Sequence, residues 1–83
     1  MTDTRRLVSL HQDDVRNARS GGGGAAALTF EMPFNDNSDR IREGGRVLFD
    51  GRLYEVGLRE DLRPPIVAER TIEFTLKEIA KDA

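Results

Sequence analysis

The sequence predicts a mainly β fold, a small antiparallel β-barrel that follows a flexible N-terminal arm. Two observations support this class. Several short segments alternate apolar and polar side chains with the period of a β-strand, and one segment contains Asp50-Gly51, a strong signal for a two-residue hairpin turn. The 83 residues make one small domain. We divide it into an arm over residues 1–27, which includes a glycine-rich loop, and a barrel over residues 28–83.

The arm carries weak structural signals. A short apolar patch predicts a strand near residues 5–10, and Asp13 or Asp14 is expected to cap one turn of helix over Val15–Arg19. Four consecutive glycines lie within Ser20–Ala27. Because glycine loses much backbone entropy on ordering, residues 18–27 are expected to be mobile in the isolated protein and to order only against a neighbour.

The first predicted barrel strand covers residues 28–34. Its apolar side chains share one face: Phe30, Met32 and Phe34. Pro33 has no amide hydrogen to donate to a ladder, so this strand is expected to lie at a sheet edge or to end there. The polar stretch Asn35–Asp39 is expected to be a solvated loop.

The clearest element is a hairpin over residues 46–58. A type I′ turn at Asp50-Gly51 sets Leu48 opposite Leu53, and residues directly opposite share a face. The face that is predicted to enter the core gathers five apolar side chains: Val47, Phe49, Tyr54, Val56 and Leu58.

Residues 59–65 are predicted to form a projecting loop of mixed charge, because two consecutive prolines interrupt regular pairing. A last strand is predicted over residues 70–79, with Ile72, Phe74 and Leu76 on one face. Four or five short antiparallel strands of this kind close readily into a small barrel. We therefore predict a Src-homology-3-like barrel.

Composition excludes several functional classes. The net charge is −2, with +1 in residues 1–27 (four Arg, three Asp) and −3 in the remainder (nine Lys or Arg, twelve Asp or Glu). A free-standing nucleic-acid binder normally has a strong basic excess. The chain has no cysteine for a disulfide or a thiolate metal site. No apolar run approaches the ~20 residues that span a bilayer, and the N-terminus lacks the apolar region of a signal peptide.

Catalytic chemistry is poorly represented. His11 is the only histidine and lies in the weakly structured arm, and the carboxylates are scattered among arginines. We predict no enzyme activity, no cofactor and no metal site.

The order of the segments resembles that of the small phage head–tail joining proteins, which are neck components also described as head-closure or stopper proteins. The alternating strand "TFEMPF" is followed by the polar link "NDNSDRIREGG", the hairpin "RVLFDGRLYEV" and the closing strand "RTIEFTLKEI". The resemblance covers residues 28–79 and corresponds to the C-terminal half of the family. Only 27 residues precede Leu28, whereas the family has a longer first half with further strands.

The resemblance implies a structural virion protein, made in the host cytoplasm, that forms a homo-oligomeric ring at the neck. Its neighbours would be the portal or adaptor above and the tail protein below, and genomic DNA would pass through the channel without sequence-specific contact. Two alternatives remain open: a virion decoration or accessory protein, and a KOW-like barrel that binds RNA or a ribosome or polymerase partner. No membrane partner is expected.

Two sets of residues are candidates for these contacts. Apolar groups that do not fit one inward face are candidates for the ring interface: Leu7, Val8, Leu10, Met32, Phe34, Leu48 and Leu53. Charged residues of the projecting loop are candidates for contact with the channel or the next ring: Arg59, Glu60, Asp61 and Arg63.

Overall fold

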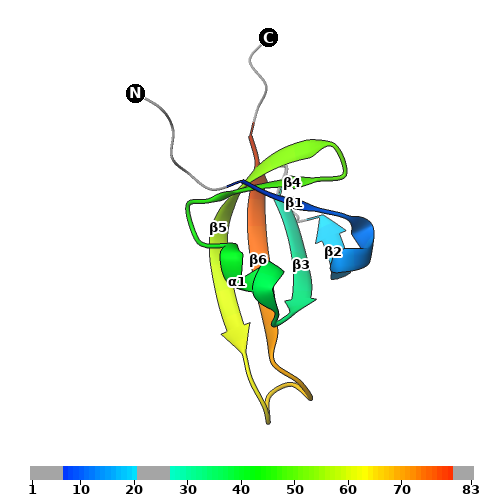
Figure 1. Ribbon diagram of the computed structural model, residues 1–83, viewed down its shortest axis with the longest axis vertical. Coiled ribbons are helices and arrows are strands. Elements are labelled where there is room, and N and C mark those ends of the chain that lie inside the picture. The colour runs from blue at the N-terminus through cyan, green and yellow to red at the C-terminus, as the bar shows by residue number, and fades with distance from the viewer. Residues whose placement is uncertain (1–6, 21–26, 80–83) are drawn as a thin grey trace.

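The computed structural model describes residues 7–20 and 27–79, which form a curled, six-stranded mixed sheet with a short helix (Figure 1). The strands lie in the order β1-β4-β5-β6-β3-β2. The elements are β1 (Leu7–Leu10), a 3-10 turn (Gln12–Asp14), β2 (Arg16–Ser20), β3 (Ala27–Pro33), α1 (Asp36–Arg40), β4 (Arg46–Phe49), β5 (Arg52–Leu62) and β6 (Thr71–Glu78). The mainly β class and the strands predicted after residue 27 are confirmed.

The predicted hairpin register is confirmed. Strands β4 and β5 are antiparallel, with Val47 opposite Tyr54 and Leu48 opposite Leu53. Asp50 and Gly51 have φ angles of 54° and 77°. Both central positions of a type I′ turn require positive φ, which explains why an aspartate and a glycine occupy them.

Strand β5 contains a bulge at Gly57 that the sequence analysis did not predict. Val56 lies opposite Leu76, but Leu58 lies opposite Thr75, so one residue of β5 is unpaired. A bulge reverses the alternation of the residues that follow it. The prediction that Leu58 enters the core is therefore wrong, because its side chain points to the outer face and is 51% exposed.

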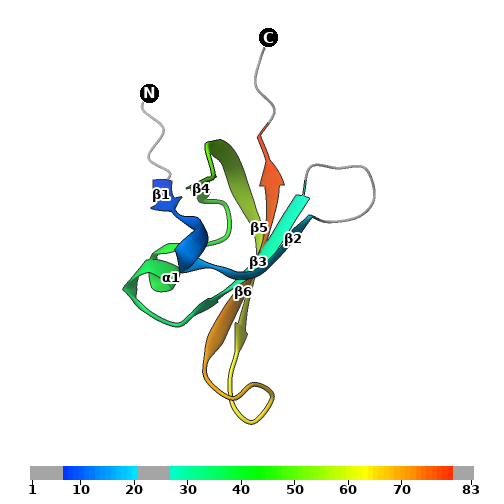
Figure 2. The ribbon, with the colours of Figure 1, turned by 90° about the vertical axis from the view of Figure 1, so that its right-hand side faces the viewer.

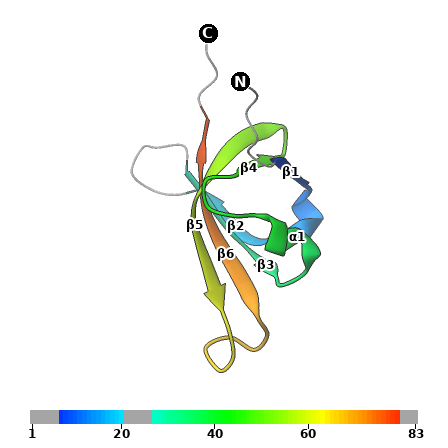
Figure 3. The same cartoon turned by 60° about the vertical axis from the view of Figure 1, so that its left-hand side comes forward.

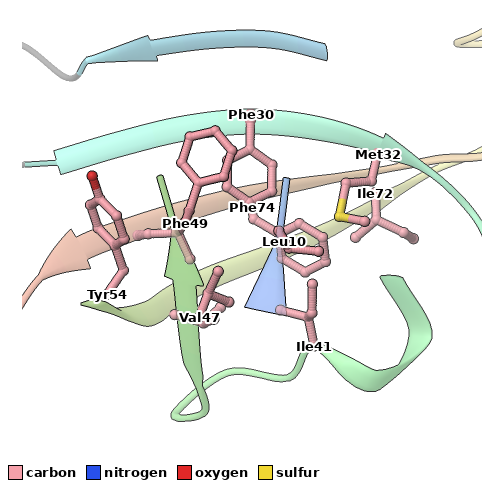
Figure 4. Close-up of a cluster of buried hydrophobic side chains, with 11 residues drawn as sticks. Leu10, Phe30, Met32, Ile41, Val47, Phe49, Tyr54, Ile72 and Phe74 are labelled. Carbon is pink, nitrogen blue, oxygen red and sulfur yellow. The ribbon is translucent and has the colours of Figure 1, made fainter. Parts of the chain in front are cut away.

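The core lies on the inner face of the curled sheet (Figure 4). Its centre is aromatic, with the Phe30 ring 5.7 Å from the Phe49 ring and 5.8 Å from the Phe74 ring. Tyr54 belongs to this core as predicted, and burial raises the pKa of its phenol. The other buried apolar side chains come from six segments: Leu10, Met32, Ile41, Val47, Val56, Ile72 and Leu76.

The described part of the predicted arm, residues 7–20, is built into the sheet. Strand β1 pairs in parallel with β4, and β2 pairs antiparallel with β3 (Figure 2). The sheet is therefore mixed rather than wholly antiparallel. The helical turn predicted over Val15–Arg19 is wrong, because residues 16–20 are a strand and the 3-10 turn precedes them. Burial of Leu10 and backbone pairing outweigh the weak local helix signal. Of the stretch predicted to be mobile, residues 18–20 belong to β2 and pair with β3, which corrects the prediction there, and the four glycines lie outside the described residues.

The chain path forces the sheet to curl. Strands β1 and β2 are the two edges of the sheet, yet only residues 11–15 separate them in sequence. A link of this length spans at most about 20 Å, so the two edges approach each other at this corner. No ladder joins β1 to β2 within the described residues, and the sheet stays open. Strand β3 is internal, between β6 and β2, and Pro33 is its last residue.

The polar stretch that was predicted to be a loop contains α1. Asn35 and Ser38 cap it reciprocally: the Ser38 amide donates to Asn35 Oδ1 at 2.9 Å, and the Asn35 amide donates to Ser38 Oγ at 2.9 Å. The Ser38 hydroxyl also donates to the Pro33 carbonyl at 3.0 Å. These bonds bury Ser38 and direct Ile41 into the core.

Replacement of Gly51 by valine is expected to lower the free energy of unfolding by about 1–2 kcal/mol or more, because a β-branched residue resists positive φ. A Cβ atom at this position would meet nothing within 4 Å, so the cost is conformational rather than steric. Denaturant unfolding of both proteins measures it. The control is Gly57→Ala, whose new Cβ would make an ordinary 3.5 Å contact with the Thr75 carbonyl. A Gly51→Val variant as stable as the wild type would contradict the turn assignment.

Candidate functional site

The most prominent surface feature is the distal hairpin, which we define as residues 58–75. Strand β4 pairs only with residues 52–55 of β5, whereas β6 follows β5 as far as Leu62. The two strands therefore extend together past α1 and end in the connecting segment 63–70 (Figure 3). This hairpin presents its tip away from the core.

The candidate loop residues are placed differently from the prediction. Arg59, Glu60 and Asp61 belong to strand β5, and only Arg63 lies in the connecting segment. The strand continues because the bulge at Gly57 lets the ladder with β6 resume. The ladder between β5 and β6 ends at Leu62, two residues before Pro64-Pro65, because proline has no amide hydrogen to donate.

An ion-pair cluster fixes the base of the tip. The Arg70 guanidinium donates two hydrogen bonds to the Asp61 carboxylate, at 3.1 and 2.7 Å, and Arg63 donates a third at 3.2 Å. These bonds hold the pKa of Asp61 well below its usual value and raise that of Arg70. Arg70 also lies 3.7 Å from the centroid of the Phe34 ring. The Phe34 amide donates to the Arg70 carbonyl at 3.1 Å.

The tip exposes an apolar side chain on this fixed base. Ile66 is 81% exposed, the largest exposed fraction among the large hydrophobic side chains of the described residues. Its amide donates to the Arg63 carbonyl at 3.0 Å, which closes a turn at the tip. A loop held in one shape loses little conformational entropy on binding. The tip therefore has the properties of a contact element.

The inner side of the distal hairpin meets α1 and the segment after it. The Arg59 side chain is only 17% exposed, and its Nη2 lies 3.9 Å from the Asp39 carboxylate. The Arg59 amide donates to the Glu43 carboxylate at 3.1 Å. Glu43 thus accepts a strand amide beyond the point where the ladder with β4 ends.

The outer face carries a row of three glutamates on adjacent strands. Glu31 of β3 lies directly opposite Glu73 of β6, which lies opposite Glu60 of β5. Like charges in this position destabilise a sheet. Strand β2 offsets part of the repulsion, because Arg19 bonds Glu73 at 3.0 Å and Asn17 bonds Glu31 at 3.1 Å. Within the described residues, the Glu60 side chain has no such partner.

The predicted interface residues fall into different environments. Leu10 and Met32 are 4% and 1% exposed and belong to the core, so the structure corrects their assignment as surface contacts. Val8 is half-buried and lines a groove of about 670 Å³ beside α1. Leu7 and Phe34 are 54% and 39% exposed, so both remain candidates for the ring interface.

The second face of the first hairpin bears the predicted leucine pair. Leu48 lies opposite Leu53, and both side chains are half-buried. The sequence analysis missed two exposed apolar residues, Leu58 and Ile66. Gly57 was the one sequence signal for the bulge that exposes Leu58. The signal for the exposure of Ile66 was its position directly after two prolines in a charged segment.

The described residues offer little catalytic chemistry. Ser9, His11 and Asp50 line one recess of about 290 Å³, but no hydrogen bond joins their side chains within residues 7–20 and 27–79. No group of three metal-ligating side chains occurs in the described part of the chain. None of the helices described there is long and apolar enough to cross a bilayer.

The Asp61 cluster predicts a pH-dependent stability. Since the folded-state pKa of Asp61 is lowered, its stabilisation is fully present above the unfolded-state pKa and is lost as the pH falls toward the folded-state value. We expect Asp61→Asn to lower the melting temperature at neutral pH. The difference between the two melting temperatures should begin to shrink below about pH 4 and should go on shrinking as the pH falls toward the folded-state pKa of Asp61. Asp13→Asn, at an exposed carboxylate outside the hairpin, is the control. A difference that persists unchanged in acid would contradict this role.

Comparison with known proteins gives no assignment. No protein-family model matches the chain, and neither a curated protein nor a solved structure shows significant similarity to it. The function is therefore argued from the geometry of the distal hairpin and the sheet edges, together with the resemblance in the order of the strands.

Proposed function

We propose that this chain is a structural protein of a tailed phage or phage-like particle, and that it joins the head to the tail as a ring at the neck. The order of elements from β3 to β6 supports the proposal, because it matches the succession on which the resemblance rests. The tight curl of the sheet around one aromatic core supports the finer assignment to Src-homology-3-like barrels. The protein would be made in the host cytoplasm and act in the virion.

The observation that carries the proposal is the distal hairpin with Ile66 at its tip. A protein that links two stacked components needs a contact element that reaches beyond its own ring. The hairpin extends past α1, is fixed by Asp61 and Arg70, and ends in an apolar side chain that is 81% exposed. A single exposed apolar side chain is not itself a patch, but on a turn that is held in one shape it is a candidate anchor for a partner pocket. We assign the tip to contact with the portal or adaptor on one side or the tail protein on the other.

The charge of the outer face favours a channel protein over a nucleic-acid reader. The row of Glu31, Glu73 and Glu60 repels phosphate, whereas RNA-binding surfaces are basic. This argues against the KOW-like alternative. It agrees with passage of genomic DNA without sequence-specific contact. A decoration protein would share the same charge and is distinguished by its place in the particle.

Replacement of Ile66 by serine tests the contact. The variant should melt like the wild type, because Ile66 is almost fully exposed. Attachment to particles should weaken by about tenfold or more if the side chain fills a partner pocket. The measurement is the amount of protein retained on purified particles, together with the fraction of heads that carry tails in electron micrographs. Ile66→Leu should retain attachment.

Other outcomes would overturn the proposal. Wild-type protein that is absent from particles would remove the virion role. Protein spread over the head surface would favour the decoration alternative. Salt-dependent RNA binding with a steep slope would favour the KOW-like module.

A further inference from the structure

We propose that copies of this chain join edge to edge, with strand β2 of one copy pairing antiparallel with the distal part of β5 in the next copy. The inference deepens the proposed function and rests on it only for the closure of the copies into a neck ring.

Both strand edges are open in the described chain. Strand β2 is the last strand of the sheet, and its five residues are exposed. The distal part of β5, residues 59–62, pairs only with β6. The ladder between β4 and β5 covers Arg52–Glu55 and does not reach these residues. On the side that no strand covers, the Arg59 amide is bonded to the Glu43 carboxylate, so a neighbouring strand would replace that side-chain bond with a backbone bond. By strand alternation, the backbone of Asp61 faces the same open side. Open edges of this kind invite strand addition.

The strand directions allow the sheet to continue from copy to copy. Strands β5, β6, β3 and β2 are neighbours in that order, and each pair is antiparallel. A second copy placed beside the first in the same orientation therefore sets its β5 antiparallel to β2 of the first. The outer faces of both copies then stay on the same side of the continued sheet.

The charges at the two edges are complementary. One outer-face row runs from Arg16 through Glu31 and Glu73 to Glu60, so it is basic at the β2 edge and acidic at the β5 edge. The next row ends in Arg19 at β2. The side chains of Arg16 and Arg19 are 57% and 53% exposed. Joining β2 to the β5 of a neighbour would place an arginine beside Glu60, which has no side-chain partner within the described residues.

The same charges disfavour the two symmetric pairings. A two-fold pairing of two β5 edges would bring the Glu60 side chains of the two copies together. A two-fold pairing of two β2 edges would bring together Arg16 and Arg19 of both copies, four arginines in all. Like charges across an interface cost several kcal/mol. The head-to-tail arrangement avoids both contacts, and head-to-tail contacts form closed rings when the rotation between copies permits.

An exposed leucine gains cover in this arrangement. Leu58 lies in the outer-face row that ends in Arg19 and is 51% exposed in the single chain. The aliphatic stem of an arginine covers apolar surface while its guanidinium remains solvated. The stem of an Arg19 side chain from the neighbouring copy would cover Leu58 while its guanidinium stays bonded to Glu73 of its own chain, and Arg16, in the row of Glu60, is the arginine that would approach that carboxylate. The edge therefore offers apolar contact as well as backbone pairing.

Charge reversal tests the pairing on the purified full chain. Glu60→Arg alone, and Arg16→Glu with Arg19→Glu, should each weaken self-association by about tenfold or more, since each sets like charges at every contact. An equal mixture of the two variants should recover association, because alternating copies have opposite charges at both kinds of contact. Sedimentation over a concentration series measures this. Glu55→Gln, on the half-buried proximal part of β5, is the control and should leave association unchanged.

Crosslinking supplies a second readout that does not depend on reversed charges. The chain has no cysteine, so Arg19→Cys and Leu58→Cys, at two positions of one outer-face row, can be introduced singly and together. A short thiol crosslinker should give a ladder of species larger than dimers with the double variant. Each single variant should remain monomeric, whereas a two-fold interface would give dimers from one of the single variants.

The results separate this inference from the proposed function. If the double cysteine variant gives no ladder, either in solution or in particles, edge-to-edge pairing is overturned even if the protein sits at the neck. Dimers from a single variant overturn it as well. A ladder together with absence from virions would support the pairing while removing the neck role.

Discussion

The pairing of β3 with β6 is the contact on which the rest of the structure depends. Seven residues of each strand lie in register, from Ala27 opposite Lys77 to Pro33 opposite Thr71. Strand alternation sends Phe30 and Phe74 into the core together, and their rings lie 5.8 Å apart. Strand β5 pairs with β6 and β2 pairs with β3, so both sides of the sheet are built outward from this ladder. A slip of one residue would expose the aromatic core.

The bulge at Gly57 divides β5 into two parts that are stabilised by different interactions. Before the bulge, Tyr54 and Val56 enter the core and contribute to stability. After it, the inner face carries Arg59 and Asp61, whose charges are compensated by neighbouring side chains. The distal hairpin therefore keeps its shape through ion pairs and hydrogen bonds rather than through a core of its own. That arrangement leaves the apolar side chains of the hairpin free for contacts with other molecules.

The outer face has an electrostatic cost within a single chain. Three glutamates lie side by side on β3, β6 and β5, and the basic strand β2 offsets only the two nearest to it. An edge-to-edge neighbour would bring a basic strand to the third glutamate. The proposed assembly would thus relieve a charge arrangement that is unfavourable in the monomer.

The sequence alone determined the parts of this protein that local chemistry controls. Strand periodicity and the type I′ preference of Asp50-Gly51 predicted the three main segments and the hairpin register, because side-chain alternation and positive φ act over a few residues. Only the tertiary structure decided the rest. Burial of Leu10 and backbone pairing drew residues 7–20 into the sheet, and a bulge at Gly57 reversed the faces of the distal hairpin. These outcomes depend on contacts between segments far apart in the chain, and the local signals, a glycine at position 57 and a short apolar patch near residues 5–10, do not specify those contacts.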